Sequence, residues 1–162
     1  MQTRNDARLA VGAPVPGRVV LLTDVNDPAF SSGALGLGAA VMPDDGTITA
    51  PVSGQLLVAM PHAYGIQTDF GTQVLVHVGI GTVNTAGQHF AMAVSPGERV
   101  SFGDTLCKID LAALSSAAID STVIVVVPNA EEDQEVRPTS AALVGRGETL
   151  LSVRGEPTDP PV

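Results

Sequence analysis

Short apolar runs, separated by glycine and proline, dominate the hydrophobic pattern of this chain. Runs of strand length predict β-strands over residues 17–22, 39–42, 54–60, 73–78, 104–109, 122–127 and 149–153. Proline- and glycine-containing turns at 43–46, 51–54 and 96–97 join several of them. The one helical pattern runs from residue 111 to 119, with Asp110 as its N-cap, and suits a helix that covers one end of a barrel. The pattern therefore predicts an all-β fold of many short strands.

Length and composition limit this fold to one domain. The chain has 162 residues, of which 44% are hydrophobic and only 3% aromatic, so its core must be built from Val, Leu, Ile and Ala. Residues 1–16 are polar or contain proline and glycine, and we expect a flexible lead-in there. The ordered domain is expected over 17–154, followed by a flexible, proline-rich tail over 155–162.

Charge and cysteine content narrow the function classes. The formal net charge is −9 and only eight residues are Lys or Arg, which argues against nucleic acid as a partner. The acidic surface suits a basic protein partner, or simply keeps the domain in solution. No run approaches the roughly 20 apolar residues that span a bilayer, so we expect no membrane insertion. The single cysteine, Cys107, allows no internal disulfide and agrees with a cytoplasmic location; it lies in a predicted strand as a core residue.

Two of the three histidines are the best candidates for chemistry. Strand alternation places the valines at 74, 76 and 78 on one face and Leu75 with His77 on the other. His77 lies near the end of a strand that stops at residues 79–81, which include two glycines, so one ring nitrogen can bond a backbone carbonyl while the other stays free as a nucleophile. His62 follows Pro61, which indicates a strand end. If these strands are neighbours, the two rings share one shallow depression.

The spacing of the histidines leaves three interpretations open. One ring takes up a phosphoryl group while the other bonds its oxygens, the two rings bind a metal, or neither has a role. A metal needs at least a third ligand, and neither Asp69 nor His89, which lies in a predicted turn, forms a ligand motif. We therefore expect no metal site. A lipoyl or biotinyl carrier is also excluded, because the only lysine, Lys108, lies inside a predicted strand rather than at a hairpin tip.

Several motifs, in a fixed order, carry a family resemblance. They cover residues 27–43, 50–54, 62–66, 77–83, 87–90, 97–104 and 110–111. Together they resemble the glucose-type enzyme IIA domains of the bacterial phosphoenolpyruvate-dependent sugar phosphotransferase system, over roughly residues 17–153. The order of the motifs is far more specific than any one of them.

The resemblance implies an antiparallel β-sandwich or partly open barrel of the hybrid-motif type, and a cytoplasmic phosphotransferase component with a phosphohistidine intermediate. On this resemblance His77 accepts a phosphoryl group through Nε2 from the phosphocarrier HPr and passes it to the IIB domain of a sugar permease. His62 lies beside it and donates to the phosphoryl oxygens, and no metal or cofactor is needed. The expected partner-docking residues are Asp27, Phe30, Leu35, Leu75 and Val83.

The chain also departs from the family pattern. Gly81 stands where the family usually has an aspartate, and the threonine that usually precedes the first histidine is missing. These changes leave an alternative, a divergent regulatory IIA-like binding module that docks partners without efficient phosphoryl transfer. Because both His62 and His77 are present, we expect a working phosphocarrier.

Overall fold

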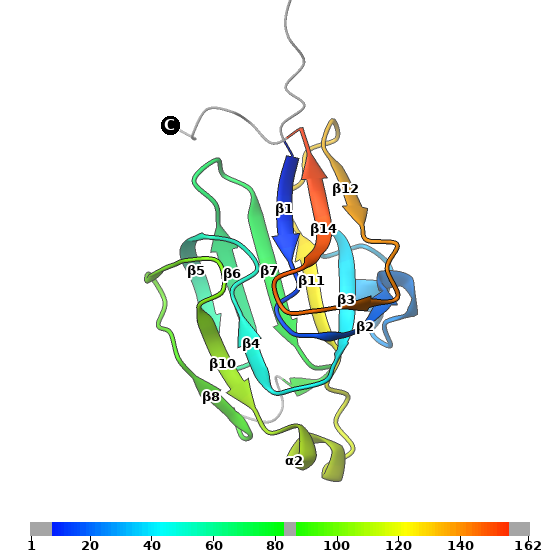
Figure 1. The fold of residues 1–162 in the computed structure, drawn as a ribbon, viewed down its shortest axis with the longest axis vertical. Helices are drawn as coiled ribbons and strands as arrows, with labels where there is room; N and C mark the ends of the chain where they lie inside the picture. Colours follow the sequence, from blue (N-terminus) through cyan, green and yellow to red (C-terminus); the bar gives the residue numbers. More distant parts are fainter. Residues whose placement is uncertain (1–7, 83–86, 156–162) are drawn as a thin grey trace, which may run out of the picture.

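The computed structural model of the protein describes residues 8–82 and 87–155, and its strands form three antiparallel sheets (Figure 1). The largest has eight strands in the order β13 (Leu143–Val144), β2 (Gly17–Leu21), β3 (Leu37–Pro43), β11 (Val123–Val127), β7 (Gln73–Val78), β6 (Ala63–Gln67), β5 (Gly54–Met60) and β9 (Arg99–Val100). One small sheet contains β1 (Arg8–Gly12), β14 (Thr149–Arg154) and β12 (Glu135–Pro138). The other contains β4 (Thr47–Thr49), β10 (Thr105–Ile109) and β8 (Phe90–Met92).

The two small sheets pack over one face of the large sheet and enclose the main core, which gives a β-sandwich (Figure 1). Val11, Ile48 and Leu106 from the small sheets meet Val76 and Val125 from the large one, and all five are 0% exposed. Strand β7 shows the alternation that its sequence predicts, since each of its valines is buried and the residues between them are only half-buried. The predicted all-β sandwich fold is confirmed.

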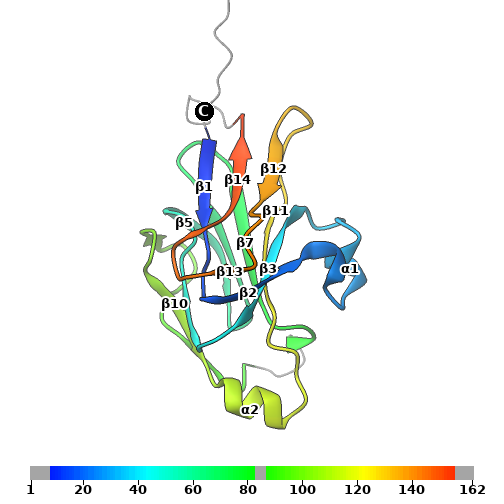
Figure 2. The ribbon, with the colours of Figure 1, turned by 45° about the vertical axis from the view of Figure 1, so that its right-hand side comes forward.

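The opposite face of the large sheet carries a second, smaller apolar cluster, which we call the outer cluster. Its buried members are Leu22, Val25, Phe30, Ala40, Ile124 and Val126. The 3-10 helix η1 (Leu22–Asp24) supplies Leu22, the short helix α1 (Pro28–Ser31) supplies Phe30, and both helices lie beside β2 and β3 (Figure 2). This face also bears His77, so the outer cluster forms the floor beneath that histidine.

The predicted helix is present as α2 (Leu111–Ser116) at one end of the sandwich (Figure 2). The carboxylate of Asp110 caps it as expected, because Oδ1 accepts a hydrogen bond from the backbone N–H of Ala113 at 3.0 Å. Leu114 is fully buried against the main core. The helix ends before residue 119 because the chain turns at Ala118, whose φ of 57° is left-handed.

The prediction of a flexible lead-in over residues 1–16 is wrong for residues 8–16. Arg8–Gly12 forms β1, which pairs with β14 in the register Arg8 to Arg154, and Val11 and Val15 are both 0% exposed. Alternating apolar residues at 9, 11, 13 and 15 fit a strand, but the strand that pairs with them lies near the other end of the sequence. Residues 1–7 and 156–162, the rest of the expected lead-in and nearly all of the expected tail, lie outside the described residues.

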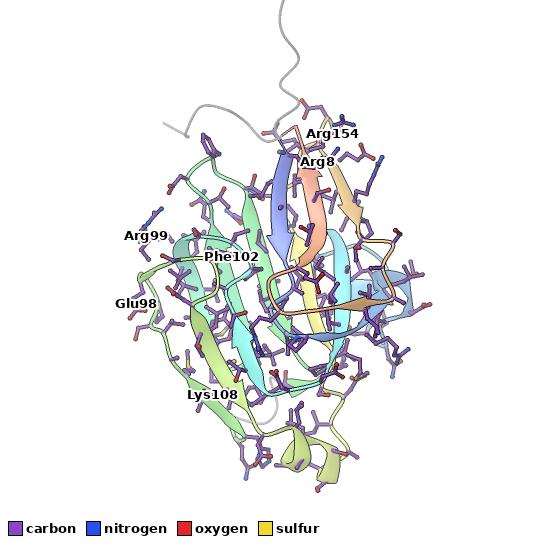
Figure 3. All side chains as sticks on the ribbon, in the orientation of Figure 1. Arg8, Glu98, Arg99, Phe102, Lys108 and Arg154 are labelled. Atoms are coloured by element: carbon purple, nitrogen blue, oxygen red, sulfur yellow. The ribbon has the colours of Figure 1, made fainter. Side chains whose placement is uncertain are left out.

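The position of the lysine and the lengths of the helices bear on two functions that the sequence argues against, a lipoyl or biotinyl carrier and membrane insertion. Lys108 lies within β10 with its side chain on the surface (Figure 3), not at the tip of a hairpin. Within residues 8–82 and 87–155, no helix has the length and apolar character needed to cross a membrane.

Candidate active site

Strand β7 holds His77 at its penultimate position, between two neighbouring strands of the large sheet. Ala63 on β6 and Ile124 on β11 are its cross-strand partners. The His77 ring is half-buried, and the ring of Phe30 packs against it with 4.9 Å between centroids. The imidazole therefore projects from a strand, not from a loop, and packs on the apolar outer cluster.

The backbone after β7 turns back and determines the proton position on His77. The Nδ1 atom lies 2.9 Å from the carbonyl oxygen of Gly79. A carbonyl oxygen can only accept, so Nδ1 carries the proton and Nε2 keeps its lone pair. Gly79 has a φ of +83°, and an added Cβ would lie 2.4 Å from Cγ2 of Thr82, so the turn requires glycine. Thr82 holds the same turn, because its Oγ1 donates to the carbonyl of Val78 at 2.6 Å.

His62 reaches the same place from a tight hairpin. Strands β5 and β6 are joined by Pro61 and His62 alone, since Met60 pairs with Ala63. The carbonyl of His62 accepts from the backbone N–H of Val78 at 2.7 Å. The His62 and His77 rings are 5.3 Å apart between centroids and meet nearly edge-on at 75°. The structure thus brings together the two histidines that the sequence singled out.

Burial keeps both imidazoles neutral near pH 7. Desolvation is the main reason that the pKa of His77 is lowered from its ordinary value, and the nearby His62 lowers it further. The bond to Gly79 and the charge of Asp27 act in the opposite direction but do not reverse the shift in the pKa of His77. Desolvation also lowers the pKa of His62. A neutral ring with a free Nε2 is a nucleophile, and a second neutral ring beside it has one N–H to donate.

Helix α1 explains the position of Phe30. Asp27 caps the helix by accepting from the N–H of Ala29 at 3.0 Å, and Pro28 occupies the first helical position. One turn later Phe30 points into the outer cluster and is only 3% exposed. The structure therefore differs from the expectation of Phe30 as a docking residue: its ring supports His77 from below and offers a partner almost no surface.

The other predicted docking residues have different surroundings. Leu75 lies on the His77 face of β7, half-buried against the outer cluster. Leu35 is 40% exposed in the loop between α1 and β3. Asp27 is half-buried at the start of α1, and Val83 lies outside the described residues. His89 lines a separate open hollow together with Lys108 and Asp110.

The donor set around the pair does not resemble a metal centre. In the described part of the chain, no three His, Cys, Asp or Glu side chains come together in a way that could hold a metal ion. Two residues that matter here did not stand out from the sequence: Gly79 through its carbonyl, and Thr82 through its hydroxyl. The position of Gly79 directly after the strand was the available signal, because a glycine there permits the reversal that brings its carbonyl to the ring.

Comparison with known protein sequences gives one consistent family. The family model described as phosphoenolpyruvate-dependent sugar phosphotransferase system, EIIA 1, matches residues 9–133. The PTS system glucose-specific EIIA component of Halalkalibacterium halodurans is 37% identical over 141 residues, covering 86% of this chain and 82% of that protein. The beta-glucoside-specific EIIBCA component of the same organism is 36% identical over 145 residues, but the chain spans only 23% of its length.

A solved structure agrees with these sequence matches. Glucose permease IIA from Mycoplasma capricolum is similar with a TM-score of 0.85 and 31% sequence identity, covering 94% of this chain and 99% of that one. The sequence match and the shared fold extend over β7 and the β5–β6 hairpin, which carry the two histidines. The chain therefore belongs to the EIIA 1 family of the phosphoenolpyruvate-dependent sugar phosphotransferase system.

Proposed function

We propose that this chain is a cytoplasmic phosphocarrier that accepts a phosphoryl group on His77 from HPr and passes it to the IIB domain of a sugar permease. The observation that supports this most directly is the 2.9 Å contact between Nδ1 of His77 and the Gly79 carbonyl. It leaves Nε2 as the only nucleophilic nitrogen of that ring. The second imidazole is 5.3 Å away between centroids, and we propose that it donates a hydrogen bond to a group on Nε2.

In the proposed transfer, the Nε2 lone pair of His77 forms a bond to phosphorus. The bond from phosphorus to the donor breaks, and its electron pair leaves with the donor. The proton stays on Nδ1 and continues to be donated to the Gly79 carbonyl oxygen, so the phosphorylated ring is an imidazolium stabilised by that carbonyl. In onward transfer, a nucleophilic group of the IIB domain forms a bond to phosphorus, the bond from phosphorus to Nε2 breaks, and its electron pair returns to the imidazole. A cationic ring is the better leaving group, which favours release to the acceptor.

His62 is proposed to stabilise charge on the transferred group. Phosphoryl transfer passes through a loose transition state whose charge is spread over the phosphoryl oxygens, so placement and hydrogen-bond donors account for most of the catalysis. A neutral His62 can donate one N–H to such an oxygen. The half-buried setting on the apolar floor strengthens that bond relative to bulk water.

Partner docking is proposed to combine apolar contact with charge. The apolar contact is proposed to come from Leu35, which is 40% exposed, and Leu75, on the His77 face of β7, and we retain Val83 in this set. Asp27 and the net charge of −9 suit a basic partner and accelerate encounter with it. These contacts orient the donor or acceptor so that its phosphorus is in line with Nε2.

Labelling tests the proposal. Incubation with phosphoenolpyruvate, enzyme I and HPr should attach one acid-labile phosphoryl group to the wild-type chain. The His77→Gln variant should remain unlabelled, whereas the His89→Gln variant, with its substitution outside the pair, should be labelled like the wild type. Label retained in His77→Gln would refute the assignment. Partner binding without label in any variant would instead support a regulatory binding module.

A further inference from the structure

Tyr64 is the only tyrosine in the chain and its side chain is 0% exposed, two residues after His62. Its hydroxyl donates to the carbonyl oxygen of Pro61 at 3.3 Å. The same hydroxyl is in side-chain hydrogen-bond contact with Cys107 on β10. A phenol in an apolar core needs such partners, since burying an unpaired hydroxyl is costly. A phenylalanine would fill the same space, so the hydroxyl itself calls for an explanation.

The turn that carries His62 is poorly suited to its strands. A two-residue hairpin normally has positive φ at one or both turn residues, which matches the strand twist. Proline fixes the φ of Pro61 near −65°, and positive φ among the described non-glycine residues occurs only at His89 and Ala118. His62 therefore sits in a hairpin whose backbone does not match the twist of β5 and β6. Such a turn needs contacts from outside to hold its shape.

Both peptide planes that flank His62 have such a contact. The carbonyl of the preceding peptide, that of Pro61, is held by the Tyr64 hydroxyl. The carbonyl of the following peptide, that of His62 itself, accepts from the backbone N–H of Val78, the residue after His77. Fixing both planes fixes φ and ψ of His62, and with them the direction in which its ring leaves the backbone.

We propose that Tyr64 is a positioning residue that aims His62 at His77 by holding the Pro61 carbonyl. This inference rests on the proposed function of the site. It assigns a positioning role to a hydroxyl buried on the core side of the large sheet, whereas the two histidine rings lie on the opposite side. The Cys107 thiol contacts the phenol from β10, a strand in a different sheet from the β5–β6 hairpin, so it supplies a matched control.

The test compares Tyr64→Phe, which removes only the hydroxyl, with Cys107→Ala, which keeps the bond to Pro61. The rate of phosphoryl transfer to a IIB domain should fall about fivefold in Tyr64→Phe, the effect of one lost hydrogen bond, and stay near the wild-type value in Cys107→Ala. The titration of the His62 ring, followed by NMR, should move toward that of an exposed histidine in Tyr64→Phe alone. In a His62→Gln background, Tyr64→Phe should cause no further loss of rate.

An unchanged His62 titration and an unchanged transfer rate in Tyr64→Phe would overturn the proposal. So would an equal loss of rate with and without His62, because that result indicates general loosening of the core. If the wild-type chain is never phosphorylated, the proposed function fails; the NMR titration, which needs no phosphate, then decides the role of Tyr64 by itself.

Discussion

A backbone atom determines which ring nitrogen of His77 carries the proton. The Gly79 carbonyl fixes the proton on Nδ1, and burial on the apolar floor lowers the pKa of the ring, so the neutral form with a free Nε2 predominates at pH 7. The neighbouring charged and titratable groups are His62 and Asp27, which shift this pKa in opposite directions. The residue thus keeps its nucleophilic lone pair without a base to remove a proton.

A pH profile should report this directly. Because burial lowers the pKa of His77 below the ordinary histidine value of 6.5, Nε2 should stay largely unprotonated between pH 8 and 7, and the labelling rate should be nearly constant there. At lower pH, protonation of Nε2 removes the lone pair and the rate should fall. NMR titration of His77 in the same buffers gives its pKa independently of HPr. A rate that already declines between pH 8 and 7, in step with His77, would contradict the shift.

At the scale of elements, the site is made by two short connections of the large sheet. One is the hairpin turn of Pro61 and His62, and the other is the reversal at Gly79 after β7. Hydrogen bonds join them, since Val78 donates to the His62 carbonyl and Gly79 donates to the carbonyl of Thr122. A substitution in either connection should therefore change the relative position of the His62 and His77 rings.

Two alanine substitutions in the same loop separate this effect from a general cost of left-handed backbone. An alanine Cβ at Gly79 would lie 2.4 Å from Cγ2 of Thr82 and 3.0 Å from the carbonyl of Asp120, whereas at Gly81, with a φ of +71°, it meets nothing within 4 Å. Gly81→Ala should cost about 1 kcal/mol in the free energy of unfolding, and Gly79→Ala about 3 kcal/mol, because the clash adds to the backbone strain. Urea unfolding measures both.

Labelling of the same two variants completes the comparison. Gly79→Ala should also slow phosphorylation of His77, since the turn must shift and the carbonyl moves away from Nδ1. Gly81→Ala should be labelled at close to the wild-type rate. Equal losses of stability and of labelling rate in the two variants would show that the Gly79 carbonyl is not needed to hold the His77 ring.

At the scale of the whole molecule, the sandwich brings together the two ends of the described chain. Strand β1 pairs with β14, and the side chains of Arg8 and Arg154 lie at the same end of the molecule (Figure 3). Their inward residues, Val11 and Val153, pack in the core behind β7 and β11. The large sheet is therefore supported on one face by this core and on the other by the outer cluster with α1.

The contribution of β1 can be measured with one substitution. Val11 is 0% exposed in the main core, so Val11→Ala should reduce the free energy of unfolding by about 2 kcal/mol through lost packing. Ala10→Ser, at the neighbouring exposed position of the same strand, should change it by less than about 0.5 kcal/mol. Urea or thermal unfolding distinguishes the two. Equal, negligible effects would mean that residues 8–12 behave as a loose lead-in after all.

Much of the architecture could be read from local patterns. Alternation along residues 74–78 was enough to predict which face of β7 is buried, because neighbouring side chains of any strand point to opposite faces. The cap at Asp110 was predictable for a similar reason, since a helix N-cap involves only residues three positions apart. Whether a segment forms a strand, and which of its side chains face the core, depends on a few consecutive residues.

The site itself depended on contacts that no local pattern contains. The sequence determined that His77 points away from the core at the end of a strand, and that His62 stands at a strand end. Only the tertiary structure decided that the two rings lie 5.3 Å apart, that Gly79 supplies the carbonyl, that Phe30 is buried beneath the ring and that β1 pairs with β14. Periodicity specifies which side a residue faces, whereas the pairing of distant strands, driven by shared burial, specifies what it faces.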